Sequence, residues 1–125
     1  KQFANMPITA RRGKKLPKYP KHAAEQFDIV FLDPPRWAKS AFGNVDLIRD
    51  YQSLFKPSLL ATKEGGQLIC CNNVAQVDRD EWLQSLTRCA VKAGRPLKSI
   101  DILLPDADFP SPDGNPPLKI AICQL

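Results

Sequence analysis

The largely apolar run 27–32 is followed at once by five residues whose side chains could bind a nucleotide: Asp33, Pro34, Pro35, Arg36 and Trp37. The carboxylate can accept hydrogen bonds from a base. The prolines fix φ and donate no backbone hydrogen bond, so the chain leaves the run on a stiff path. The guanidinium can grip a phosphate, and the indole can stack on a base. The segment therefore offers the chemistry of a nucleobase site.

The element that must position this segment is the run 27–32, which is rich in β-branched and aromatic residues. Such a run is typical of a strand that is covered on both faces in a parallel sheet. Asp33 then lies at the carboxyl end of the strand, where open α/β sheets have their ligand crevice. The alternative is that Asp33 merely caps a turn after the strand.

Two helices are predicted after this segment. In 46–62, Ile48, Tyr51, Phe55 and Leu59 are spaced to form one apolar face, and Pro57 should kink or restart the helix. We interpret Tyr51 and Phe55 as core residues. The second helix begins at Asp78, which can cap its first turn with Glu81 three residues later, and it carries Trp82 in its apolar stripe.

Strands are expected at 67–71, after the Gly65-Gly66 pair, and at 97–104 and 118–125. The last two are separated by the segment 105–117, rich in Pro and Asp, which we interpret as a long connection or flap. The order of strands and helices predicts an α/β fold.

The segment 33–40, Asp-Pro-Pro-Arg-Trp-Ala-Lys-Ser, resembles motif IV of class I S-adenosylmethionine (SAM)-dependent methyltransferases. It is most similar to the family that methylates cytosine in large-subunit ribosomal RNA. The resemblance covers 27–125 and implies the carboxyl half of the catalytic domain. The implied fold is a Rossmann-like half-sheet of parallel strands and helices that ends in an antiparallel strand pair.

The resemblance also implies what this chain should lack. The family's amino half holds the glycine-rich loop that grips SAM, and no Gly-x-Gly follows a strand here. The resemblance implies that Asp33 and Pro34 contact SAM. Because the glycine-rich loop is missing, we expect this chain alone to bind SAM poorly and to be inactive. Without the amino half, the strand 27–32 has an exposed edge. We expect that edge to pair with a second copy, an exchanged segment or a missing amino-terminal part.

Two mechanisms are compatible with these residues. In the first, implied by the resemblance, the Cys71 thiolate adds to the cytosine ring while Asp33 orients the base. Alternation along the strand turns Cys70 the other way. Asn72 follows Cys71 where the family has Ser, and both cysteines could equally be packing residues.

In the second mechanism, Asp33 and the Pro34 carbonyl hold an exocyclic base amine toward the methyl donor, while Trp37 stacks on the base. Arg36 stands where such enzymes place the aromatic residue. In either case the residues expected at the substrate are Pro34, Pro35, Arg36, Trp37, Lys39 and, from the flap, Phe109.

The segment 1–26 carries seven Lys and Arg residues against the single acid Glu25, in a chain of net charge +5. We interpret it as a basic, flexible lead-in that either holds RNA phosphates or serves as a solvated linker. The function predicted for the chain is methylation of RNA, most simply ribosomal RNA. The competing hypothesis is a catalytically silent α/β module that binds RNA.

The remaining composition narrows the class of protein. No apolar run is long enough to span a membrane and no signal peptide is visible, so a cytoplasmic location is expected. The four cysteines lack metal-ligand spacing and are expected to be reduced. No metal site is expected, and we interpret the only histidine, His22, as solvent-exposed.

Overall fold

The computed structural model describes residues 23–40, 43–109 and 111–125, so most of the expected lead-in lies outside the described residues. Eight elements follow one another in this part of the chain: β1 (Phe27–Leu32), β2 (Trp37–Ser40), β3 (Gly43–Asp46), α1 (Tyr51–Ala61), β4 (Thr62–Asn72), α2 (Arg79–Lys92), β5 (Ser99–Leu103) and β6 (Lys119–Gln124). Neither helix is long and apolar enough to cross a membrane.

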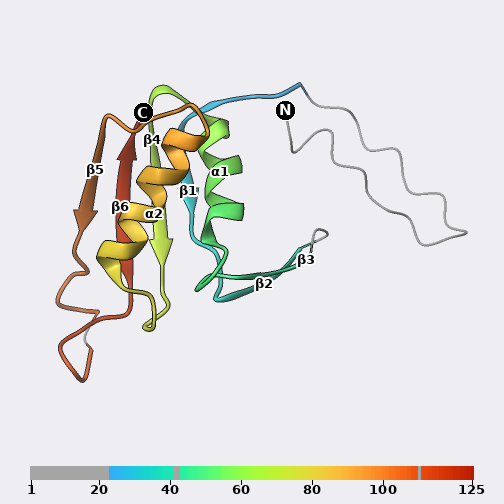
Figure 1. The fold of residues 1–125 in the computed structure, drawn as a ribbon. Coiled ribbons are helices and arrows are strands. Elements are labelled where there is room, and N and C mark those ends of the chain that lie inside the picture. Colours follow the sequence, from blue (N-terminus) through green and yellow to red (C-terminus); the bar gives the residue numbers. More distant parts are fainter. Residues whose placement is uncertain (1–22, 41–42, 110) are drawn as a thin grey trace, which may run out of the picture.

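The main sheet has four strands in the order β1-β4-β6-β5. β1 and β4 are parallel, whereas β6 pairs in antiparallel register with both β4 and β5. Figure 1 shows β1 and β5 at the two edges of the sheet, α2 in front of the strands and α1 next to β1. The predicted α/β fold, with a parallel pair followed by an antiparallel pair at the carboxyl end, is confirmed.

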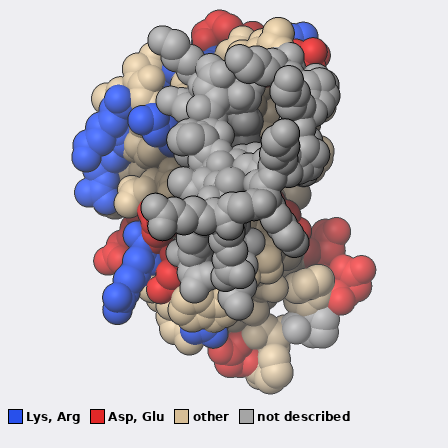
Figure 2. Space-filling view, turned by 90° about the vertical axis from the view of Figure 1, so that its right-hand side faces the viewer, with Lys and Arg blue, Asp and Glu red and all other residues tan. Residues whose placement is uncertain are grey.

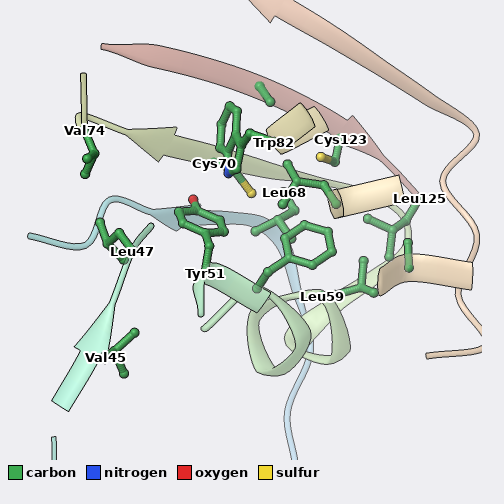
Figure 3. Packing of buried hydrophobic residues seen from close by; sticks show 14 residues of the cluster. Val45, Leu47, Tyr51, Leu59, Leu68, Cys70, Val74, Trp82, Cys123 and Leu125 are labelled. Atoms are coloured by element: carbon green, nitrogen blue, oxygen red, sulfur yellow. The ribbon is translucent and has the colours of Figure 1, made fainter. Parts of the chain in front are cut away.

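The core lies between the helices and one face of the sheet. α1 contributes Tyr51, Phe55 and Leu59, and α2 contributes Trp82, which is 4% exposed. The sheet supplies the alternate residues of β4 and β6 that face the helices: Leu68, Cys70, Ala121 and Cys123. Figure 3 shows Cys70 and Leu68 of the sheet next to the Tyr51 and Trp82 side chains of the two helices. The interpretation of Tyr51, Phe55 and Trp82 as core residues is confirmed.

The expectation that β1 is covered on both faces is wrong. Val30 and Leu32 pack against the core, whereas Ile29 and Phe31, which alternate with them, are 56% and 72% exposed. Both helices pack on the same side of the sheet, so the apolar residues on its other side have no cover within the described part of the chain. β1 has the composition of a strand buried on both faces but lies at an edge with one face open.

The first helix begins later than its apolar spacing predicted. Asp46 still belongs to β3, where it pairs with Trp37, and its carboxylate accepts a 3.0 Å hydrogen bond from the Ile48 backbone N–H. The chain therefore turns before α1 starts at Tyr51, and Ile48 is 43% exposed instead of lying on the helix face. α1 runs as one helix through Pro57 and does not restart there, although proline has no backbone N–H to donate within the helix.

β4 begins at Thr62, five residues before the predicted strand start. The register with β1 shifts between Phe27, which lies opposite Thr62, and Ile29, which lies opposite Gln67. The glycine pair lies within this irregular stretch, where Gly65 has a φ of 77°. The residues before the predicted strand thus form an irregular beginning of the same strand. The Asp78 cap of α2 is confirmed, because its carboxylate accepts a 2.9 Å hydrogen bond from the Glu81 N–H.

Candidate functional site at the carboxyl ends of two parallel strands

The sheet register places Asp33 beside Cys71. Leu32 lies opposite Cys70 in the parallel pair of β1 and β4, so the next residue of each strand comes out at the same edge of the sheet. Asp33 is exposed and Cys71 is half-buried. The two residues proposed for chemistry, separated by 38 positions in the sequence, therefore lie on adjacent strand ends.

Cys70 and Cys71 face opposite sides of the sheet, as alternation along a strand requires. Cys70 is fully buried against the helices, next to Cys123 and Tyr51 (Figure 3). A hydrogen bond with Cys123 and burial raise the pKa of the Cys70 thiol far above its ordinary range. All four cysteines are free thiols. Cys70 is thus a packing residue, and Cys71 is the one that faces the open side of the sheet.

The environment of Cys71 favours its protonated form. Burial raises the pKa of the Cys71 thiol, and the negative charge of Asp33 raises it further. A thiolate beside a carboxylate is disfavoured because the two negative charges repel each other. At neutral pH the Cys71 side chain is therefore a thiol in this state of the protein, and forming a thiolate requires a proton acceptor or a nearby cation.

Tyr51 holds the same strand end from the core side. Its hydroxyl donates a 2.8 Å hydrogen bond to the Cys71 carbonyl oxygen. The Tyr51 and Trp82 rings are perpendicular, with centroids 5.4 Å apart. Apolar spacing predicted Tyr51 as a core residue but gave no signal of the hydrogen bond, since a hydroxyl partner across 20 residues depends on how α1 docks on the sheet.

Asn72, the residue after Cys71, is fully buried. Its side-chain oxygen accepts a 3.1 Å hydrogen bond from the Val74 N–H, while its side-chain nitrogen has no partner among the residues that the structure describes. Asn72 therefore shapes the turn that follows β4, which explains in structural terms why an amide can stand where the resembled family has Ser.

The residues after Asp33 present a flat aromatic surface to solvent. Trp37 opens β2 and is 61% exposed, and the Arg36 guanidinium lies 6.0 Å from the centre of its ring. Pro34 is half-buried and Pro35 is exposed. Lys39 lies in β2 opposite Asn44, and its side chain lies outside the described residues. The structure thus places Asp33 beside Cys71, and Pro34, Arg36 and Trp37 follow Asp33 in the chain.

Phe109 lies elsewhere. It follows β5, which is the opposite edge strand from β1, and its backbone N–H donates to the Asp106 carbonyl oxygen. Figure 1 shows the loop after β5 at the other side of the molecule from the β2–β3 hairpin. The structure does not bring Phe109 together with Asp33.

A hollow with a volume of about 490 Å³ lies by this loop and the start of α2. Lys119 borders it and donates to the carbonyls of Val74 and Pro117; burial lowers the pKa of its ammonium. Asp33 and Cys71 line neither this hollow nor the one beside Tyr51 and Trp82. Asp33 is itself exposed to solvent.

The residues expected to contact SAM lie in one short segment of the described chain. Asp33 and Pro34 stand at the carboxyl edge of the sheet, where a cofactor would lie. The described glycines with positive φ are Gly65, Gly94 and Gly114, and none lies in a turn from the carboxyl end of a strand into a helix. Nor do the described His, Cys, Asp and Glu residues form a group that could hold a metal ion.

No protein-family model matches the chain. It is 36% identical over 67 residues to ribosomal RNA large subunit methyltransferase K/L of Marinobacter nauticus. This alignment covers 52% of the present chain and 9% of the relative. The chain is 28% identical over 91 residues to ribosomal RNA large subunit methyltransferase I of Vibrio vulnificus. This second alignment covers 73% of the present chain and 23% of the relative. The chain thus spans less than a quarter of the length of these curated relatives.

Solved structures agree with the fold. A protein from Streptococcus mutans that is assigned as a SAM-dependent methyltransferase superposes with a TM-score of 0.61 and 19% identity. A second solved chain, assigned as a methyltransferase and determined with S-adenosylhomocysteine, superposes with a TM-score of 0.62 and 20% identity. The match covers 81% of the present chain and 27% of that second chain. These comparisons confirm the predicted resemblance: the fold is that of SAM-dependent methyltransferases, and the sequence is similar to methyltransferases of large-subunit ribosomal RNA.

Proposed function

We propose that residues 27–125 are the carboxyl half of a catalytic domain that transfers methyl groups from SAM to RNA, with ribosomal RNA as the substrate. The observation that carries the proposal is the placement of Asp33 and Cys71 on adjacent strand ends, with the exposed Trp37 next in the chain. The sequence similarity to ribosomal RNA methyltransferases supports the choice of substrate.

Each side chain of the segment has a role in this function. Trp37 stacks on a base that has left its stack, and Arg36 binds a neighbouring phosphate. Asp33 and the Pro34 carbonyl accept hydrogen bonds from the base and fix its orientation, because neither proline offers a competing donor. Pro35 stiffens the segment, and Lys39 adds a further phosphate contact.

SAM supplies an electrophilic methyl group on a sulfonium. Asp33 and Pro34 are the residues of this chain that border its position, and the remaining contacts come from polypeptide that the described residues do not include. This chain by itself is therefore proposed to bind SAM weakly and to transfer methyl groups poorly.

Cys71 is the proposed nucleophile, adding to the ring of the target base and activating the neighbouring carbon. The alternative route, methylation of an exocyclic amine held by Asp33 and Pro34, needs no thiolate. The raised pKa of the Cys71 thiol favours that alternative, unless RNA binding brings Arg36 or another cation close enough to lower it. The two routes make opposite predictions for the substitution of Cys71.

RNA binding needs cations beside the site. Arg36, in the segment after Asp33, is exposed, and Figure 2 shows Lys and Arg side chains, with Asp and Glu among them, along one border of the view. Phosphate contacts of this kind dominate affinity and weaken as salt rises. The basic residues of 1–26 are proposed to add to them, and a ribosomal RNA substrate places the protein in the cytoplasm.

The free edge of β1 is proposed to be paired in the active protein. β1 pairs on one side with β4, and its other side has no strand within the described residues. An apolar edge next to an open apolar face favours association. The occupant is a second copy, an exchanged segment or further polypeptide of the same domain; a mass measured by light scattering distinguishes the first two from a monomer.

The function is tested by methyl transfer from radiolabelled SAM to ribosomal RNA, using the longest gene product that contains this chain. Cys71→Ala and Asp33→Asn are compared with Cys89→Ala, a half-buried cysteine of α2. We expect Asp33→Asn to lower transfer by about a hundredfold or more, because base orientation contributes on that scale. Loss of transfer in Cys71→Ala supports the covalent route, and its retention supports the amine route.

A protein that binds RNA but neither binds SAM nor transfers methyl groups would overturn the enzyme proposal in favour of the silent RNA-binding module. Methyl transfer that is unaffected by Asp33→Asn would show that Asp33 does not orient the base and would contradict the proposed site. RNA binding that does not weaken with salt would contradict the proposed phosphate contacts.

A further inference from the structure

Tyr51 is a buried tyrosine whose hydroxyl contacts the backbone of the proposed nucleophile. The residue is 5% exposed, and its hydroxyl donates the 2.8 Å hydrogen bond to the Cys71 carbonyl oxygen. Figure 3 shows its ring standing between α1 and the sheet, beside Trp82. A hydroxyl is not needed to fill the core, so a phenylalanine would pack equally well at this position apart from that one bond.

The hydrogen bond acts on the end of a strand. The parallel pairing of β1 with β4 is last recorded at Leu32 and Cys70, one residue before Cys71. On its other side Cys71 pairs with Ile120 of β6. Tyr51 thus holds the strand end from a third direction, and the perpendicular contact with Trp82 holds the Tyr51 ring.

We propose that Tyr51 is a positioning residue: its hydrogen bond to the Cys71 carbonyl oxygen fixes the Cys71 thiol beside Asp33. The role of this placement in catalysis rests on the proposed function, whereas the placement itself is a property of the folded chain. Tyr51 touches neither base nor methyl donor and acts through Cys71.

The groups that face Cys71 make this placement measurable. Asp33 reaches it from β1, the uncharged Ile120 lies opposite on β6, and Tyr51 approaches from α1. Burial keeps Tyr51 protonated in alkaline solution, so it adds no charge. The Asp33 carboxylate is the charge that raises the pKa of Cys71 in the described part of the chain. The size of the Asp33 effect therefore reports the separation of the two groups.

The experiment measures the rate of alkylation of Cys71 by iodoacetamide as a function of pH, with the modified peptide quantified by mass spectrometry. It is made in a Cys89→Ser background, because Cys70 and Cys123 are fully buried and do not compete. Asp33→Asn is expected to lower the pKa of Cys71. In Tyr51→Phe, the same Asp33→Asn substitution should lower it by about half as much or less, since the coupling of the pair is lost with their placement.

Thr62→Val is the matched control. Thr62 is also fully buried, and its hydroxyl donates a 2.9 Å hydrogen bond to the Ser58 carbonyl oxygen, at the opposite end of β4. It should lower stability as Tyr51→Phe does but leave the Asp33→Asn effect unchanged. Where Tyr51→Phe is partly unfolded, the titration is made in sucrose, which favours the compact state.

An Asp33→Asn effect of the same size with and without the Tyr51 hydroxyl would overturn the proposal, as would an equal loss of the effect in Thr62→Val. Neither SAM nor RNA enters this measurement. A protein without methyl transfer can therefore still confirm the positioning role, and an active enzyme can still contradict it.

Discussion

Phe31 of β1 lies in register with Ile69 of β4, on the face of the sheet that neither helix covers. Phe31 is 72% exposed, whereas Phe55 of α1, on the covered side, is fully buried. The same residue type thus occupies two opposite environments in one small fold, and the open face is where further polypeptide would pack.

Phe31→Ser and Phe55→Ala should differ sharply in their effect on the free energy of unfolding. Removing the buried ring leaves a cavity and should cost about 3 to 5 kcal/mol. Removing the exposed ring should change stability by about 0.5 kcal/mol or less and should reduce self-association. Urea unfolding monitored by Trp fluorescence measures both. A large loss of stability in Phe31→Ser would show that this face is already covered.

Gly66→Ala should disrupt the start of β4. A Cβ at this position would lie 2.7 Å from the Asp28 carbonyl oxygen and 3.0 Å from that of Lys63, and both atoms belong to the backbone. We expect a loss of about 2 kcal/mol or more, because the β1–β4 pairing must shift. Gly94→Ala is the control: its Cβ would meet nothing within 4 Å, and its φ of 72° should cost about 1 kcal/mol. Equal losses in thermal unfolding would argue against the clash.

Arg95→Met should destabilise the junction between α1 and β4. The guanidinium donates 2.6 Å hydrogen bonds to the carbonyls of Leu59 and Thr62, and its side chain is 16% exposed. Methionine keeps the apolar stem but leaves both carbonyls without this donor, at a cost of about 1 to 3 kcal/mol. Arg79→Gln, which removes an exposed ion pair with Asp80, should cost well under about 1 kcal/mol. Urea midpoints that fall equally would contradict this assignment.

Stability should fall as the solution becomes alkaline. Burial raises the pKa of Tyr51, and a hydrogen bond with Cys123 together with burial raises that of Cys70. Above about pH 9 the unfolded chain releases these protons while the folded chain retains them, so the unfolded state binds fewer protons. Each group then lowers the free energy of unfolding by up to about 1.4 kcal/mol per pH unit.

Denaturant titrations at a series of alkaline pH values measure this slope. Tyr51→Phe should make it shallower, because one of the two groups no longer titrates. A slope that is unchanged in Tyr51→Phe would show that the hydroxyl ionises in the folded protein as it does in water.

The order of the two helices and of the four strands of the main sheet could be predicted from the sequence, because local patterns carry them, whereas the β2–β3 hairpin was not predicted. The apolar run before Asp33 predicted β1, and Asp78 with Glu81 predicted the start of α2 to the residue. Alternation along β4 separated Cys70 from Cys71 correctly. Each of these signals depends on neighbours in the chain, since side-chain period and capping are local properties.

The tertiary structure decided what depends on distant partners. Apolar spacing extended the first helix back to Asp46, but pairing with Trp37 holds Asp46 in a strand. Composition predicted a β1 covered on both faces, but both helices pack on one side and leave Phe31 exposed.

For the candidate site, too, part of the arrangement follows from the sequence and part only from the tertiary structure. The sequence by itself determined that Asp33 ends one strand and that Cys71 comes near the end of another. Only the parallel register brought the two together, and only the docking of α1 placed the Tyr51 hydroxyl on the Cys71 carbonyl oxygen. Contacts of this kind depend on how separately formed elements pack, which no local periodicity encodes.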